Sequence, residues 1–153
     1  HHELLLWDPG DRYVAVERDG HILGLLNCYD LRFPEQARAL RLRARADILV
    51  GVAWWPWRRD HVWRTLLQAR AIENAAWVVG CCVAASEHPG ESFAGAGNHV
   101  FDPLGEPVRT PDDHLYALDP ERARAVIVNP LTAAVSIDEV AVFGSPGARP
   151  RRA

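Results

Sequence analysis

Residues 22–35 read ILGLLNCYDLRFPE and join two kinds of secondary structure at a single cysteine. The apolar run 22–26 has the length of a buried strand, and Pro34 stands at a favoured first position for a helix that continues over 35–46. Cys28 is therefore predicted to lie in a turn from a strand to a helix. Such a turn lifts a side chain out of the sheet beside free backbone N–H groups, which suits a nucleophile that attacks a carbonyl.

Each cysteine also has a simpler interpretation. A lone cysteine beside an apolar strand, such as Cys28, is usually a small buried hydrophobic residue. Cys81 and Cys82 are adjacent in an apolar run and are predicted to lie inside a strand, pointing to its opposite faces. A zinc site built from them with His88 lacks the two-residue spacing of a zinc knuckle, so we expect no metal.

The composition describes one soluble domain. Of 153 residues, 48% are hydrophobic and 24% charged, which is enough apolar material for a substantial core. The net charge of -3 and the lack of a long apolar segment argue against nucleic-acid and membrane partners, and nothing resembles a signal peptide. Three irregularly spaced cysteines do not make a disulfide framework, so we expect reduced thiols and a cytoplasmic location.

Strand and helix patterns alternate along the chain, which predicts an α/β fold with a layered core. An Asp-Gly turn joins the first two strands into an antiparallel hairpin, and Asp60 is a suitable N-cap for the second helix. The predicted elements, in order, are strands at 13–17 and 22–26, a helix at 35–46, a strand at 47–53, a helix at 61–76, strands at 77–85, 98–101 and 115–118, and a short helix at 119–125.

Aromatic residues follow the strand at 47–53, where a binding loop commonly lies. Trp54, Trp55 and Trp57 could stack on a ligand. Covering the core or a subunit interface is the simpler interpretation, which we prefer for at least two of the three.

Three further polar side chains are predicted to have structural roles. Arg70 and Glu73 stand three residues apart on a helix and are expected to pair, in a structural or interfacial role rather than a catalytic one. His99 could act as a base, but a histidine near the end of a strand is more often only hydrogen-bonded.

The segment Cys28–Glu35 closely resembles the nucleophile motif of the nitrilase superfamily, the carbon-nitrogen hydrolases, and particularly its omega-amidase-like branch. Eight successive residues make this a specific signal. The resemblance extends over roughly residues 3–125, through the segments 38–42, 46–50, 55–56, 63–67, 69–74 and 101–106 and through Arg59.

This resemblance implies the C-terminal part of an αββα four-layer sandwich, which in the family pairs with itself into a homodimer. On that basis residues 1–143 are a partial carbon-nitrogen hydrolase domain and residues 144–153 a disordered tail rich in Pro, Gly and Arg. The chain lacks an initiator methionine, so we expect it to be the remainder of a longer product.

The resemblance also implies the chemistry. Cys28 would be the nucleophile, the backbone N–H of Tyr29 would help hold the oxyanion, and Glu3 would be a supporting carboxylate, although a glutamate near a chain end is more often only solvated. A small amide would be hydrolysed through a thioester with release of ammonia and without a cofactor.

Two members of the family's catalytic set have no counterpart in this sequence. The family's base glutamate and its lysine precede the segment that matches residues 3–11, and the sequence contains no lysine. We therefore expect the chain by itself to hydrolyse no amide at a useful rate. The alternative is a non-catalytic remnant that serves as a dimerisation or ligand-binding module.

The sequence departs from the family pattern at positions near the expected pocket, so the resemblance does not specify the substrate. The departures are Trp54 and Cys82 in place of asparagine, Val62 in place of histidine, Val83 in place of arginine and His99 in place of serine.

Overall fold

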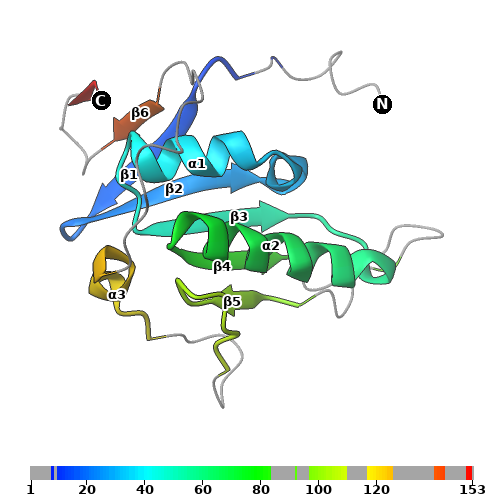
Figure 1. Ribbon diagram of the computed structural model, residues 1–153. Coiled ribbons are helices and arrows are strands. Elements are labelled where there is room, and N and C mark those ends of the chain that lie inside the picture. Colours follow the sequence, from blue (N-terminus) through cyan, green and yellow to red (C-terminus); the bar gives the residue numbers. More distant parts are fainter. Residues whose placement is uncertain are drawn as a thin grey trace.

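The computed structural model describes residues 8, 10–83, 92, 97–109, 117–125, 140–143 and 151–152. These residues build a seven-stranded sheet in the order β5-β4-β3-β2-β1-β6-β7 (Figure 1). Its elements are β1 (Tyr13–Arg18), β2 (His21–Asn27), the 3-10 helix η2 (Cys28–Arg32), α1 (Pro34–Leu42), β3 (Ile48–Ala53), the 3-10 helix η3 (Trp57–Arg59), α2 (Asp60–Asn74), β4 (Trp77–Cys82), β5 (His99–Phe101), α3 (Pro120–Ala125), β6 (Val140–Phe143) and β7 (Arg151–Arg152).

The centre of the sheet is parallel. β2 pairs with β3 and β3 with β4, so that Leu25, Val50 and Val79 stand in one row across the three strands. Because the strands are parallel, their C-terminal ends meet at the same edge of the sheet. β1 is antiparallel to β2 through the predicted Asp19-Gly20 turn, in which both residues have positive φ, 51° and 79°.

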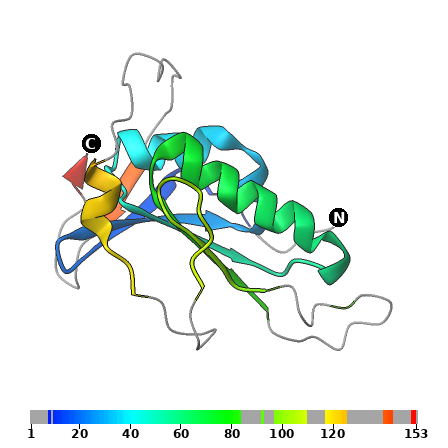
Figure 2. The same ribbon diagram turned by 60° about the horizontal axis from the view of Figure 1, so that its bottom comes forward.

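Both long helices cover the same face of this sheet (Figure 2). α1 packs Leu40 against Gly24 of β2, and α2 packs Leu67 against Gly80 of β4. Leu40, Leu67 and the neighbouring Trp63 are completely buried. The helices can lie this close because glycines in the strands beneath them leave space for large side chains.

The opposite face of the sheet is open over its centre within the described part of the chain. Leu25 is 39% and Val52 50% exposed there, and Cys81 is exposed beside Val52. At the other end of this face Ala123 of α3 packs with the buried Trp77. The predicted α/β class is confirmed, whereas the second sheet of a four-layer sandwich stays a prediction.

Arg41 joins several elements at the edge of the sheet where β3 and β4 begin. Its guanidinium donates hydrogen bonds to the carbonyls of Asn74, Ala46 and Ala123 at 3.1, 3.0 and 2.7 Å. It also pairs with the buried carboxylate of Asp47 at 3.2 Å. This arginine therefore ties the ends of both long helices to α3, at the edge opposite Cys28.

The first helix is shorter than the sequence predicts. α1 ends at Leu42 instead of continuing to Ala46, and Arg45 has a φ of 60°. The N–H of Ala46 bonds to the carbonyl of Leu40 at 3.0 Å, which turns the chain back toward β3. Apolar periodicity persists through this turn because Ala44 and Ala46 are buried, and so it overstates the length of the helix.

Other predicted element bounds are also wrong, and α2 ends at Asn74 rather than at Ala76. Asp60 is the first residue of α2 rather than its N-cap, which is Arg59. Of the strand predicted at 115–118, Ala117 and Leu118 are described and belong to no strand. Leu118 packs against the cluster around Trp77.

Several predicted features fall outside the described residues. They include the last residues of the strand predicted at 77–85, the whole segment 126–139, and the tail apart from Arg151–Arg152, which pair with β6. None of the helices in the described ranges is both long and apolar enough to cross a membrane.

Candidate active site

Cys28 occupies the turn that the sequence predicts, between the end of β2 and the helix α1. Asn27 is the last residue of β2, and Cys28 opens η2 with a φ of 47°. This left-handed conformation is uncommon for a residue with a Cβ and is found where the surroundings impose it. The chain turns sharply at Cys28 for this reason, so that its side chain is presented at the C-terminal edge of the parallel strands.

Hydrogen bonds within the turn maintain this shape. The carboxylate of Asp30 accepts the N–H of Asn27 at 3.1 Å, and the carbonyl of Asp30 accepts the N–H of Phe33 at 2.9 Å. The first N–H groups of a helix have no carbonyl partner within it, and in η2 these include the N–H of Tyr29. A donor predicted for the oxyanion therefore lies next to the cysteine. The side chain of Tyr29 is 63% exposed.

Cys82 lies on the same side of the sheet as Cys28. Its strand position pairs with Ala53 of β3, and both cysteines pack against the same buried cluster. The Cys82 thiol contacts the carbonyl of Trp55 at 3.6 Å. Burial raises the pKa of the Cys82 thiol, and the nearby Cys28 and Asp60 raise it further. A smaller fraction of the Cys82 thiol is therefore ionised at neutral pH than of an ordinary cysteine.

Cys81 points to the opposite face, as predicted, but it is exposed rather than enclosed in an apolar strand. The sequence suggests burial because residues 77–82 are apolar on both sides, whereas no described element covers this part of the sheet. The neighbouring strands still desolvate the thiol and raise its pKa. Cys81 is thus accessible but deprotonates less readily than an ordinary cysteine.

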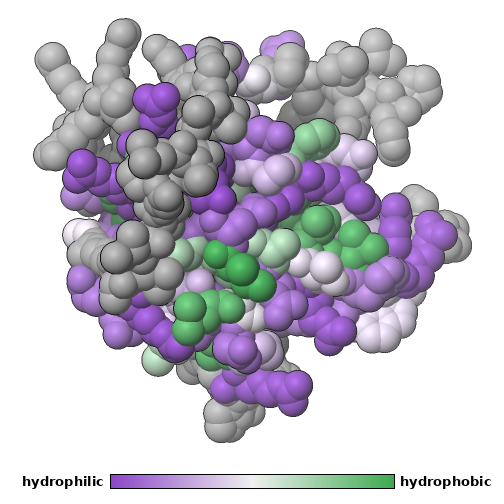
Figure 3. All heavy atoms as spheres, in the orientation of Figure 1, coloured by the Kyte–Doolittle hydropathy of each residue, from purple (hydrophilic) through white to green (hydrophobic). Residues whose placement is uncertain are grey.

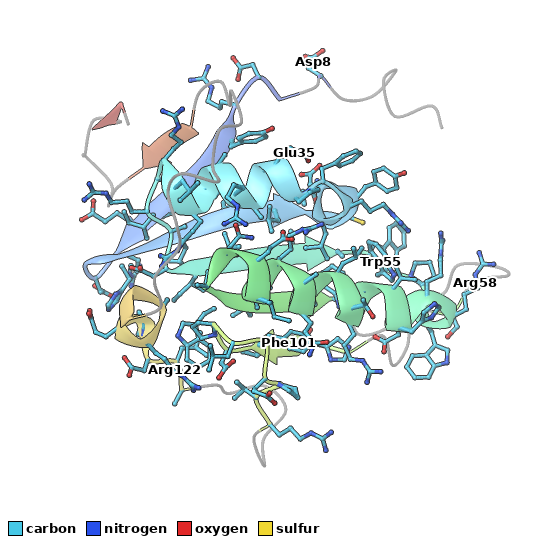
Figure 4. The ribbon with its side chains drawn as sticks, in the orientation of Figure 1. Asp8, Glu35, Trp55, Arg58, Phe101 and Arg122 are labelled. Carbon is cyan, nitrogen blue, oxygen red and sulfur yellow. The ribbon has the colours of Figure 1, made fainter. Side chains whose placement is uncertain are left out.

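Aromatic side chains and one arginine border the turn. The guanidinium of Arg32 lies 5.3 Å from the ring centre of Tyr29 and 5.5 Å from that of Trp55. Trp55 is buried and donates its indole N–H to the carbonyl of Arg59 at 2.9 Å. Figure 4 shows Trp55 and Arg58 at this end of the sheet, with Arg122 at the opposite end.

Of the three clustered tryptophans, only Trp55 serves the core. Trp54 and Trp57 are 57% and 52% exposed. We predicted that at least two of the three tryptophans cover the core or a subunit interface. Within this chain, only Trp55 does so. A subunit interface for the other two stays a prediction.

His99 has a structural partner. Its Nε2 lies 3.0 Å from the Oδ1 of Asp60, the residue that begins α2. Both side chains are largely buried. The interpretation of His99 as a hydrogen-bonded residue is confirmed, and the pair holds the start of α2 against β5.

Glu3 and His88 lie outside the described residues. The structure therefore does not place the predicted supporting carboxylate relative to Cys28. In the parts of the chain that the structure describes, no group of three or more His, Cys, Asp and Glu side chains could hold a metal ion.

A cavity of about 570 Å³ lies between α2 and β5, and sequence reasoning did not identify it. Its lining includes Arg64, Gln68, His99 and Arg109. Residues of the turn at Cys28 are not part of the lining, so this cavity is distinct from the predicted nucleophile. No sequence motif marks it, because its walls come from segments about 40 residues apart.

Comparison with known proteins agrees with the motif at Cys28. A family model for carbon-nitrogen hydrolases matches residues 1–116. The chain is 41% identical over 112 residues to the omega-amidase YafV of Escherichia coli, which covers 73% of this chain. It is 42% identical over 103 residues, 67% of this chain, to a 2-oxoglutaramate amidase of Bacillus subtilis.

A solved structure is similar in fold. It is an amidase from Nesterenkonia sp. AN1 in which acrylamide has added to the active-site cysteine, with a TM-score of 0.55 and 29% identity over 70% of this chain. The match covers 41% of that amidase, and the two curated relatives are covered over 42% and 39% of their length. The chain thus spans about two fifths of each protein it matches. Because the family model matches well over half of its residues, the chain belongs to the carbon-nitrogen hydrolase family.

Proposed function

We propose that this chain supplies the cysteine nucleophile and an oxyanion donor of an amidase that hydrolyses a small amide to its acid and ammonia. The observation that carries the proposal is the left-handed Cys28, which begins η2 directly after the parallel strand β2. In addition, the relatives include an omega-amidase and a 2-oxoglutaramate amidase.

The first half of the reaction forms a thioester. The Cys28 thiolate attacks the amide carbonyl carbon, and the N–H of Tyr29 stabilises the negative oxygen of the tetrahedral intermediate. The C–N bond then breaks and the leaving nitrogen takes up a proton, which releases ammonia. A backbone donor suits this task because its direction is set by the turn, so that little reorganisation is needed when the charge develops.

The second half regenerates the cysteine. A base removes a proton from water, the water oxygen attacks the thioester carbonyl, and the acid leaves as the C–S bond breaks. The resemblance assigns this base to a glutamate and places a lysine beside the reacting carbonyl. Both precede the segment matching residues 3–11, and Glu3 would support them.

Turnover by the 153-residue polypeptide alone should therefore be close to background. Loss of a general base typically costs about 10²- to 10⁴-fold in rate. Loss of an oxyanion-stabilising group costs about 10²- to 10³-fold, and the two losses do not simply multiply. An arginine is a poor replacement for the lysine because its planar guanidinium stays protonated and has a different geometry.

The test is ammonia release from omega-amides of dicarboxylic acids, with and without the preceding half of an omega-amidase relative supplied as a second polypeptide. We expect turnover only when the two are combined, and none with Cys28→Ser. Turnover that persists with Cys28→Ser would show that Cys28 is not the nucleophile. Activity of the polypeptide alone would show that the missing glutamate and lysine are not needed.

We also propose that the chain forms a homodimer through its helical layer, and that it acts in the cytoplasm. Hydrophobic surface lies over the C-terminal half of α2 and the turn after β5 (Figure 3). The exposed residues there are Ile72 and Leu104, at 56% and 58%. A contiguous exposed apolar surface on a helix is a common feature of subunit contacts.

A further inference from the structure

We propose that Arg70 is a positioning residue that holds the turn at Cys28 in its reactive shape, and that Glu73 in turn orients Arg70. The proposal rests on the proposed function, because it concerns how the nucleophile and its oxyanion donor are arranged. Arg70 belongs to α2, and its Nε and Nη2 donate hydrogen bonds to the carbonyl of Leu31 at 3.1 and 2.9 Å. Its Nη1 pairs with the carboxylate of Glu73.

The burial of Arg70 indicates that these contacts are specific. Its side chain is 5% exposed, so the guanidinium has lost nearly all contact with water. A buried charge is tolerated only where hydrogen bonds and an opposite charge replace its hydration. Here Glu73 supplies the charge and Leu31 accepts two N–H groups. Because the guanidinium is planar and rigid, two donors on one oxygen restrict both the position and the direction of that carbonyl.

Leu31 connects this contact to the nucleophile. It lies three residues after Cys28 in η2, and its side chain is buried. Carbonyls in the last turn of a helix have no partner within the helix, so an outside donor is needed for one that is withdrawn from water. Arg70 is that donor, and it anchors η2 to a helix whose Trp63 and Leu67 are completely buried.

The turn is consequently held on both sides of Cys28. The carboxylate of Asp30 bonds to the N–H of Asn27 before it, and Arg70 bonds to the carbonyl of Leu31 after it. A left-handed cysteine relaxes toward negative φ unless the surrounding structure prevents it. If η2 loosens, the N–H of Tyr29 changes direction relative to the Cys28 sulfur. We therefore infer that Arg70 acts on the reaction through the direction of this donor.

Two reactions of Cys28 distinguish a role of Arg70 in orienting the oxyanion donor from a role in stabilising the fold. With p-nitrophenyl acetate the thiolate attacks the carbonyl, an S–C bond forms, the C–O bond breaks, and p-nitrophenolate leaves a thioester on the protein. The carbonyl oxygen becomes negative in this step, so the reaction depends on the oxyanion donor. With iodoacetamide the thiolate displaces iodide, and no oxyanion forms. Mass spectrometry of the Cys28 peptide measures both rates.

The chain offers a matched control. Arg41 is likewise a poorly exposed, multiply hydrogen-bonded arginine paired with a carboxylate, but it lies at the opposite edge of the sheet. Arg70→Lys and Arg41→Lys both keep the positive charge but remove the planar set of guanidinium N–H donors. We expect Arg70→Lys to slow acylation of Cys28 about tenfold while alkylation changes by less than about twofold, and Arg41→Lys to change neither rate beyond about twofold.

Other outcomes would overturn the proposal. If Arg70→Lys lowers acylation and alkylation equally, or if Arg41→Lys lowers acylation as much, Arg70 contributes only stability. Glu73→Gln retains Arg70 and should slow acylation about threefold with folding intact, because a neutral amide orients the guanidinium less firmly than a carboxylate. If Arg70→Lys does not fold, an unchanged acylation rate in Glu73→Gln rejects the proposal.

Amide hydrogen exchange distinguishes failure of this proposal from failure of the proposed function. If Cys28 of the unaltered chain is not acylated even when the preceding half of the omega-amidase relative is supplied, the proposed function is wrong. The N–H groups of Asn27 and Phe33 still report on the turn, because each bonds to Asp30. Arg70→Lys should speed their exchange about tenfold or more relative to Arg41→Lys. Equal exchange in the two variants would reject Arg70 as the residue that holds the turn.

Discussion

Cys28 combines a strained backbone conformation with its proposed role as the nucleophile. A left-handed backbone costs a residue with a Cβ about 1–2 kcal/mol relative to its preferred conformations. At Cys28 the packing of Leu31 and the hydrogen bonds of Asp30 and Arg70 offset this cost. The same turn places the N–H of Tyr29, the proposed oxyanion donor, directly after Cys28 in the chain. A glycine would relieve the strain but would remove the proposed nucleophile.

The three cysteines are predicted to differ in reactivity. In the folded chain at pH 7 we expect iodoacetamide to label Cys28 first, because burial raises the pKa of the Cys81 and Cys82 thiols and lowers their thiolate fraction. Labelling of these two should keep increasing with pH beyond the point where an ordinary thiol is fully ionised. Peptide mapping after brief treatment measures the order. Earlier labelling of Cys82 than of Cys28 would contradict the assignment.

Arg45 has a strained backbone conformation that is unrelated to the proposed catalysis. Its φ is 60°, and it is exposed, so replacing it removes little packing. Arg45→Gly should raise the free energy of unfolding by about 1 kcal/mol, because glycine adopts this conformation without strain. Arg43→Gly is the control, since Arg43 has a φ of -89°.

At Arg43 the same substitution should lower the free energy of unfolding by about 0.5–1 kcal/mol, because glycine gains no relief of strain there and loses more entropy on folding. Urea denaturation of the two variants measures both values. Stabilisation by both, or by neither, would show that backbone strain at Arg45 is unimportant.

At the scale of elements, the sheet and the helices fit through glycines. A Cβ at Gly80 would overlap the buried Leu67 and come within 2.9 Å of Trp63. A Cβ at Gly51 would lie 3.5 Å from Trp63 and 3.6 Å from Leu67, which is ordinary contact. Gly51 and Gly80 pair in neighbouring strands under the same helix, so they differ mainly in the space above them.

Gly80→Ala should therefore lower the free energy of unfolding by about 1–3 kcal/mol, because completely buried side chains of α2 cannot move aside freely. Gly51→Ala should change it by less than about 0.5 kcal/mol, since no neighbour has to move. Thermal or urea unfolding of the pair tests this prediction. A comparable loss at both positions would mean that α2 sits closer to β3 than the structure has it.

The whole molecule offers two candidate surfaces for the proposed homodimer. The open sheet face exposes Val52 and the helical layer exposes Ile72. We expect the chain to sediment as a dimer at micromolar concentration and Ile72→Asp to convert it to monomers. Val52→Asp should leave the dimer intact. Substitutions at exposed positions change the free energy of unfolding by about 0.5 kcal/mol or less, so both variants should fold.

Two results of sedimentation would contradict this prediction. A monomer for the unaltered chain would exclude self-association at that concentration. If only Val52→Asp dissociated the dimer, the dimer contact would lie on the open sheet face instead of the helical layer.

The order of the elements around Cys28 and the type of turn that carries it follow from the amino-acid sequence alone. These features are local: an apolar run of strand length, an Asp-Gly hairpin turn and Pro34 at the first position of α1 each act within a few residues. The same local information placed His99 in a hydrogen bond and paired Arg70 with Glu73, and the structure confirms both. The α/β class followed from the alternation of elements.

Features that depend on contacts between distant segments become visible only in the folded chain. The bonds from Arg70 to Leu31 span 39 residues, and no local pattern specifies them. Cys81 is exposed because nothing described covers its face, although its strand is apolar on both sides. α1 ends four residues early because the chain must turn toward β3. Periodicity records which residues are buried, and it cannot tell whether a helix, a strand or a turn buries them.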